Sequence, residues 1–144
     1  MTRPDIVAAA RGWIGTPYHH QASLKGVGCD CLGLLRGVWR ELLGAEPEPV
    51  PAYGPDWADP SGDDPLLVAA RTHLVALAAG EGGGAGDVVL FRWRPHLAAK
   101  HCSILTERGT MIHAHDGAAV TEVALVAGWR RRMAGTFRFP GLTP

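Results

Sequence analysis

The chain has 144 residues, of which 47% are hydrophobic and 19% charged, a length and balance typical of one soluble globular domain spanning residues 1–144. Lys and Arg together number 14, as do Asp and Glu. The basic surplus typical of nucleic-acid-binding proteins is therefore absent, and we expect no nucleic-acid partner. No apolar run approaches the roughly 18 residues of a membrane-spanning helix, so we expect no membrane insertion.

The N-terminal segment carries Pro4, Asp5 and Arg11 where a secretory signal needs an unbroken apolar stretch. We therefore expect synthesis in the cytoplasm without an export signal. The chain has three cysteines, and Cys29 and Cys31 are too close to join separate elements. A disulfide framework is not expected, and the thiols should be reduced.

Two stretches near the start of the chain have the apolar periodicity of helices. The first covers Pro4 to Trp13. The second begins at Cys31 and ends before Gly44, and its apolar positions are Leu34, Leu35, Val38, Trp39, Leu42 and Leu43. Asp30 stands where an N-cap belongs, because its carboxylate can accept hydrogen bonds from the first backbone N–H groups. Cys31 is therefore expected in the first turn of this helix.

Residues 45–65 contain six prolines, six acidic residues and neither Lys nor Arg, a composition that does not favour regular packing. We expect a long surface loop here. Asp64 and Pro65 then resemble an N-cap followed by proline at the first helical position. They predict a third helix that runs through Leu77 and ends at Gly80.

Beyond the glycine-rich residues 80–86 the pattern changes to short apolar runs separated by turn residues. These runs are rich in β-branched and aromatic residues, as expected for the strands of an antiparallel meander. They read DVVLFRW, HCSILTE, TMIHAH, AVTEVAL and GTFRF. Because helices precede strands along the chain, the predicted fold class is α+β.

Cys29 and Cys31 flank Asp30, and three kinds of chemistry compete for them. Zinc binding would need two further ligands, which Cys102 and several histidines could supply, but a one-residue spacing is unusual for zinc. A redox pair normally has two residues between its cysteines. A nucleophilic Cys31 fits better, because a helix N-terminus favours a thiolate and its N–H groups can bind an oxyanion. A buried structural cysteine is the plain alternative, and the simplest reading of Cys29.

The segments GTPYHHQ, CDCLGLL, KHCSIL and MIHAH together resemble the NlpC-type cysteine peptidases of bacterial cell walls, particularly their phage-tail and gene-transfer-agent branch. The resemblance extends over nearly the whole chain. It implies a papain-like core in which N-terminal helices, one of them carrying the nucleophile, pack on a small antiparallel sheet that carries the catalytic histidine. This arrangement agrees with the order of elements predicted above.

The resemblance also implies roles for three catalytic residues. Cys31 corresponds to the nucleophile of the family's Asp-Cys-Ser-Gly signature, from which this chain departs at Leu32. His101, which opens a predicted strand, corresponds to the base. His113, twelve residues later, corresponds to the polar residue that orients the base. His115 is the alternative for this third role, because residues two apart on a strand share a face.

Two further residues are implied to border the substrate. Tyr18 corresponds to the tyrosine of the family's Pro-Tyr pair, whose hydroxyl lies near the oxyanion, and Asp30 precedes the nucleophile in the signature. No metal or other cofactor is implied.

The implied activity is hydrolysis of an amide bond in peptidoglycan stem peptides, between D-glutamate and the diamino acid. Peptidoglycan is the expected partner, together with phage-like tail or baseplate proteins that would carry the chain to the periplasmic cell wall. Two alternatives stay open. One is an N-acetylmuramoyl-L-alanine amidase with the same catalytic residues, and the other is a non-catalytic tail module stabilised by zinc.

Overall fold

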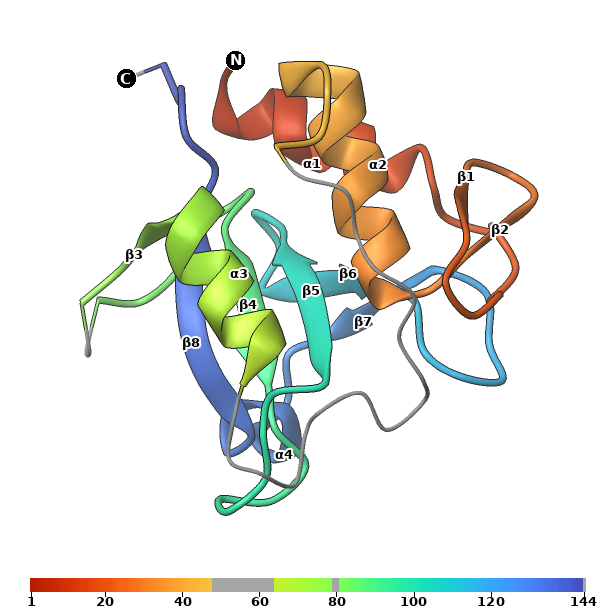
Figure 1. Cartoon of the computed structure of the whole chain (residues 1–144). Helices are drawn as coiled ribbons and strands as arrows, with labels where there is room; N and C mark the ends of the chain where they lie inside the picture. Colours follow the sequence, from red (N-terminus) through yellow and green to blue (C-terminus); the bar gives the residue numbers. More distant parts are fainter. Residues whose placement is uncertain (48–63, 79–80, 144) are drawn as a thin grey trace.

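A computed structural model describes residues 1–47, 64–78 and 81–143 of the chain (Figure 1). Its helices are α1 (Arg3–Arg11), α2 (Cys31–Leu43), α3 (Pro65–His73) and the single turn α4 (Ala127–Arg130). Its strands are β1 (Ser23–Leu24), β2 (Gly28–Cys29), β3 (Val75–Ala76), β4 (Val88–Phe91), β5 (His101–Leu105), β6 (Thr110–His113), β7 (Thr121–Ala124) and β8 (Met133–Arg138). Most of the predicted loop at 45–65 lies outside the described residues.

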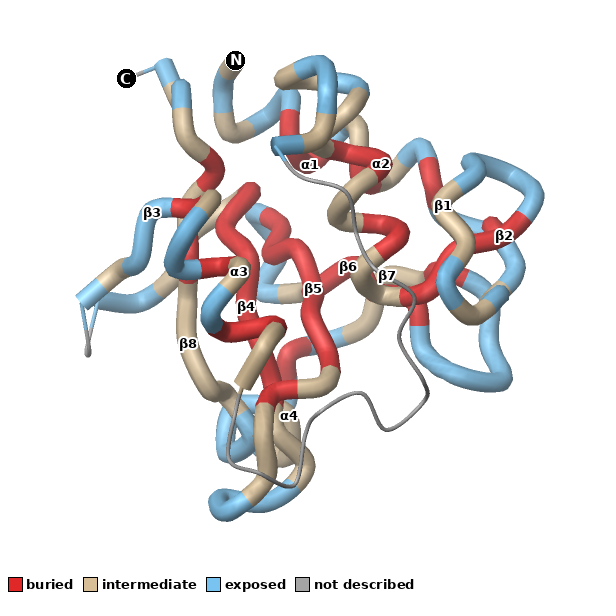
Figure 2. Tube along the Cα trace, viewed as in Figure 1, coloured by how far each residue is buried: buried red, intermediate tan, exposed pale blue. Residues whose placement is uncertain are grey.

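The strands form a six-stranded sheet in the order β3-β8-β4-β5-β6-β7 and a small two-stranded sheet of β1 and β2. Each pairing of neighbouring strands is antiparallel. All residues of the central strands β4 and β5 are buried, as the red tube in Figure 2 shows. The predicted α+β class and the antiparallel sheet are confirmed. Among the described residues, none of the helices is long and apolar enough to cross a bilayer.

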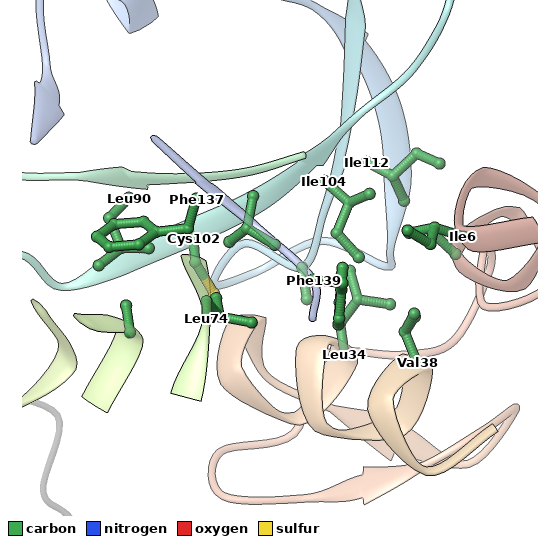
Figure 3. Packing of buried hydrophobic residues seen from close by; sticks show 14 of the residues in the cluster. Ile6, Leu34, Val38, Leu74, Leu90, Cys102, Ile104, Ile112, Phe137 and Phe139 are labelled. Atoms are coloured by element: carbon green, nitrogen blue, oxygen red, sulfur yellow. The ribbon is translucent and has the colours of Figure 1, made fainter. Parts of the chain in front are cut away.

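The two faces of the sheet are covered differently. One face packs against α1, α2 and α3, and Figure 3 shows Leu34 and Val38 of α2 pointing toward Ile104 and Ile112 of the sheet. The other face carries a smaller apolar cluster that includes partly buried Trp129 of α4. Alternate residues of β5 therefore point toward α2 and away from it.

The packing of α1 against α2 depends on a glycine. A Cβ atom at Gly37 would lie 1.9 Å from Cζ2 of Trp13, a fully buried side chain just after α1. Only glycine leaves room for this indole, whose Nε1 donates a hydrogen bond to Glu41 at 3.1 Å. The contact fixes where α2 lies on the sheet and therefore where its N-terminus points.

The first two predicted helices are confirmed, and so are the Asp30 cap and the Gly44 stop predicted for the second. Thr2 and Asp5 form a capping box at the start of α1. Asp30 caps α2, because its Oδ1 accepts a hydrogen bond from the Gly33 N–H at 2.7 Å. Gly44 follows α2 with a positive φ of 88°, which glycine adopts without strain.

The prediction for the third helix is wrong at its C-terminal end. The helix α3 stops at His73, and residues 75–76 form the edge strand β3, which pairs with β8. Leu77 was predicted to be helical, but its N–H donates to the carbonyl of Thr136 at 2.9 Å. Pairing with the open edge of β8 satisfies backbone groups of residues 75–77, so this tertiary contact overrides the helical pattern.

Candidate active site

Cys31 is the first residue of α2, and the carboxylate of Asp30 fixes its position. Oδ1 of Asp30 accepts from the Gly33 N–H, while Oδ2 accepts from the Gln21 N–H at 2.8 Å. One carboxylate thus ties the preceding loop to the start of the helix. Cys31 lies at the positive end of the helix dipole, where backbone N–H groups have no partner inside the helix.

His101 opens β5 and His113 ends β6, and the two imidazoles meet below the protein surface. Nε2 of His101 lies 2.8 Å from Nδ1 of His113, and only 3% and 4% of the two residues is exposed. Burial, reinforced by the charges of His101 and His115, lowers the pKa of His113 to about 3. His113 is therefore neutral at physiological pH, so its Nδ1 can accept the Nε2–H of His101. The other ring nitrogen of His101 is left for a different partner.

That partner is the thiol of Cys31. A hydrogen bond from the Cys102 thiol, followed by the hydrogen bond and positive charge of His101, lowers the pKa of Cys31 well below that of an ordinary thiol. Burial and the charge of Asp30 oppose this effect but do not cancel it. As a thiol, Cys31 donates to the carbonyl of Lys100, with an Sγ–O distance of 3.8 Å. The site therefore favours the thiolate form of Cys31.

Two tryptophans, which no sequence motif marked, enclose the His101 ring. Trp93 stacks on it with centroids 5.6 Å apart and an interplanar angle of 23°, and Trp129 stacks at 5.6 Å and 29°. Aromatic faces stabilise an adjacent cation and exclude water from it. Trp93 ends the predicted strand DVVLFRW, and Trp129 lies between two predicted strands, so neither position indicated a contact with His101.

His115, the alternative to His113, lies nearby without the same contact. Its ring centroid is 5.4 Å from that of His101 and 5.8 Å from that of His113, and the residue is exposed. Burial of its ring atoms, together with the charge of His101, lowers its pKa. The structure thus brings His113 into hydrogen-bonding distance of His101 and leaves His115 on the wall of the cleft.

An open cleft of about 410 Å³ leads to these residues. Its lining includes Tyr18, Asp30, Cys31, Trp93, His101 and His115. Burial and then the negative charges of Asp30 and Cys31 raise the pKa of Tyr18 to about 12, so its hydroxyl stays protonated and can donate a hydrogen bond. Four of the five residues predicted for the site therefore line this cleft. The fifth, His113, lies next to it and is within hydrogen-bonding distance of His101.

Metal binding is the alternative hypothesis for the role of the cysteines. Within residues 1–47, 64–78 and 81–143, no group of three or more His, Cys, Asp or Glu side chains is arranged to hold a metal ion. In this part of the chain all three cysteines are free, with Cys29 and Cys102 buried and Cys31 partly exposed. Burial raises the pKa of Cys29 to about 12, as expected for a structural cysteine.

No protein-family model and no curated protein matches the sequence, but solved structures match the fold. An NlpC/P60 family protein from Bacillus cereus has a TM-score of 0.69 and 19% identity over 96% of this chain and 40% of its own. The NlpC/p60 domain of the peptidoglycan hydrolase SagA has a TM-score of 0.65 and 21% identity, over 96% of this chain and all of that domain.

A third match has a different role. RipD from Mycobacterium tuberculosis, described as a non-catalytic NlpC/p60 domain protein adapted to peptidoglycan binding, has a TM-score of 0.59 and 12% identity, covering 96% of both chains. At such identities the likeness concerns the fold and not the activity. The chain also spans less than half the length of the Bacillus cereus protein. The predicted fold is confirmed: the chain has the NlpC/P60 fold.

Proposed function

We propose that this chain is a cysteine peptidase that hydrolyses amide bonds in peptidoglycan stem peptides. The observation that carries the proposal is the Cys31–His101–His113 arrangement, in which a neutral, buried His113 accepts from a His101 that hydrogen-bonds a low-pKa thiol. Nucleophilic catalysis by cysteine needs these three features. The similarity in fold to SagA, a peptidoglycan hydrolase by name, supports the substrate class.

The first half of the reaction forms an acyl-enzyme. The Cys31 thiolate attacks the carbonyl carbon of the amide, and the oxygen becomes an oxyanion near the N-terminus of α2. Backbone N–H groups of the first turn, together with the Tyr18 hydroxyl, are the donors available to it, and one such donor contributes about 3–4 kcal/mol to a transition state. His101 then protonates the amine nitrogen, the C–N bond breaks, and a thioester to Cys31 remains.

The second half releases the acid. His101, now neutral, removes a proton from a water molecule that attacks the thioester, and the thiolate leaves as the protonated imidazole is restored. His113 stays neutral throughout and holds the His101 ring in one orientation. Trp93 and Trp129 limit access of bulk water to the ring between these steps.

The bond that we propose joins D-glutamate to the diamino acid of the stem peptide. Incubation of purified peptidoglycan with the wild type should release fragments that carry a new amino terminus on the diamino acid, identified by mass spectrometry. Fragments cut between the sugar and L-alanine would instead indicate the amidase. Cys31→Ala should release neither.

The second candidate function is binding of the cell wall without catalysis. It is supported by the similarity in fold to RipD, which is described as non-catalytic and adapted to peptidoglycan binding. Sedimentation with insoluble peptidoglycan separates the two. A peptidase should digest the wall and leave Cys31→Ala bound to it, whereas a binding protein should sediment in both forms without releasing fragments.

The chain's route to the wall is also part of the proposal. On the sequence resemblance, we propose that it is a component of a phage-like tail or baseplate and acts at the periplasmic cell wall. Density-gradient fractions of lysates should contain the protein in particles. Its presence only in the free protein fractions would contradict this assignment.

A further inference from the structure

Cys102 is a second thiol directly beneath Cys31, and the reaction described above gives it no part. It is the second residue of β5 and is 2% exposed. Its side chain lies on the face of the sheet that packs against the helices (Figure 3), on the opposite side from its neighbour His101. Its thiol donates to the backbone carbonyl of Cys31, with an Sγ–O distance of 3.2 Å.

Lys100, which precedes β5, and the first two residues of β5 therefore contact Cys31. The carbonyl of Lys100 accepts from the Cys31 thiol, the ring of His101 hydrogen-bonds its sulfur, and Cys102 holds its carbonyl. The Lys100 contact suits a protonated thiol, because a carbonyl oxygen repels a thiolate. The other two contacts come from groups that can donate a proton.

The Cys102 thiol can serve two acceptors. Besides donating to the Cys31 carbonyl, it interacts with the sulfur of Cys31 and lowers the pKa of that thiol. A thiolate is a stronger acceptor than a peptide carbonyl, because hydrogen bonds to charged groups are the stronger kind. Deprotonation of Cys31 should therefore turn the Cys102 S–H from the carbonyl toward the sulfur.

Cys102 also keeps the proton that this role requires. Its hydrogen bond with Cys31, followed by burial and the negative charge of Cys31, raises the pKa of Cys102 well above the ordinary thiol value. One thiol of the pair is thus a thiolate and the other a donor. Burial alone would instead favour the protonated form of both thiols.

We propose that Cys102 is a positioning residue, whose S–H holds the first turn of α2 when Cys31 is a thiol and stabilises the Cys31 sulfur when it is a thiolate. The inference rests on the proposed function in taking Cys31 as the nucleophile. A hydrophobic side chain would fill the same space without donating a hydrogen bond. Cys102 therefore contributes through its proton and not only through packing.

The test measures the rate at which iodoacetamide alkylates Cys31 as a function of pH, with peptide mass spectrometry to identify the modified cysteine. The variants are Cys102→Ser, which keeps a donor, Cys102→Ala, which removes it, and Cys102→Val, which removes it but fills the space. For Ala and Val the midpoint of alkylation should rise by about one to two pH units, the size expected from loss of one hydrogen bond to a charged group. For Ser it should stay at or below the wild-type midpoint.

Circular dichroism and thermal unfolding show which variants are folded. Coincident midpoints for wild type, Ala and Val would overturn the proposal. If Ala and Val fail to fold, the Ser variant still decides it, because a midpoint raised by one unit in the presence of a hydroxyl donor would be incompatible with a donor role. A wild type that is alkylated at low pH but cleaves no peptidoglycan would overturn the proposed function and leave the role of Cys102 standing.

Discussion

Replacing His113 tests the central hydrogen bond of the site. His113→Leu removes the Nδ1 atom that lies 2.8 Å from Nε2 of His101, in a position that is almost fully buried. A hydrogen bond from a charged donor contributes about 1.5–3 kcal/mol, so kcat/KM should fall by about 10- to 150-fold, since each 1.36 kcal/mol corresponds to a factor of ten. The rate of fragment release from a defined muropeptide, followed by mass spectrometry, measures this loss.

A matched variant separates the hydrogen bond from packing. In His113→Asn the Oδ1 atom is bonded to Cγ, as Nδ1 is in histidine, so an acceptor remains near its original place. This variant should keep kcat/KM within a few-fold of the wild type, and so should His115→Leu, because His115 lies on the exposed wall of the cleft. Full activity in His113→Leu together with loss of activity in His115→Leu would refute this reasoning and move the orienting role to His115.

Three further predictions concern protonation and stability. Iodoacetamide should alkylate wild-type Cys31 at a pH well below the ordinary thiol range, and His101→Ala should move this reaction to higher pH because it removes a hydrogen bond and a positive charge. The free energy of unfolding should fall as pH drops from 6.5 toward about 3, because in this range His113 is protonated in the unfolded state but not in the folded state. Urea titrations at several pH values measure this fall, which should be smaller in His113→Asn. Burial would raise the pKa of Asp87, but its hydrogen bonds with Arg138 and the Gly84 N–H and its proximity to Arg3 outweigh burial and lower it. Because the side chains of Arg3 and Arg138 are 32% exposed, neither is left as a buried unpaired charge, and Asp87→Asn should cost about 1.5–3 kcal/mol in urea unfolding.

Local signals in the sequence were enough to place Cys31, the proposed nucleophile. The apolar period of α2, the Asp30 cap and the Gly44 stop all act within a few residues of one another, so no tertiary information was needed to put Cys31 in the first helical turn. The pairing of His101 with His113 is less local, because it depends on the register of β5 and β6. It was expected only from the family spacing, and in the folded chain the two rings lie within hydrogen-bonding distance.

The parts that sequence reasoning missed depend on contacts between distant segments. Trp93 follows β4 and Trp129 lies in a one-turn helix, and the two meet over His101 because Arg92 N–H donates to the carbonyl of Arg132 at 2.9 Å, which joins their segments. Neither periodicity nor motif spacing reports such a contact. The role proposed for Cys102 was missed for a different reason. A cysteine in a buried strand is ordinarily a packing residue of the core, so its position in the sequence did not indicate a contact with Cys31.

The similarity to RipD shows that this fold alone does not determine whether the chain is catalytic, so the distinction depends on its side chains. Binding a wall polymer requires an accessible surface, and buried imidazoles would add nothing to it. Here two histidines, each no more than 4% exposed, lie beside a thiol of low pKa, and burial of such groups costs stability unless they are paired. The Leu32 departure removes a hydroxyl from the signature but leaves the backbone N–H groups of the first turn in place. This arrangement therefore supports the proposed chemistry at Cys31 over binding alone, because a protein that only binds would be more stable with apolar residues at these positions.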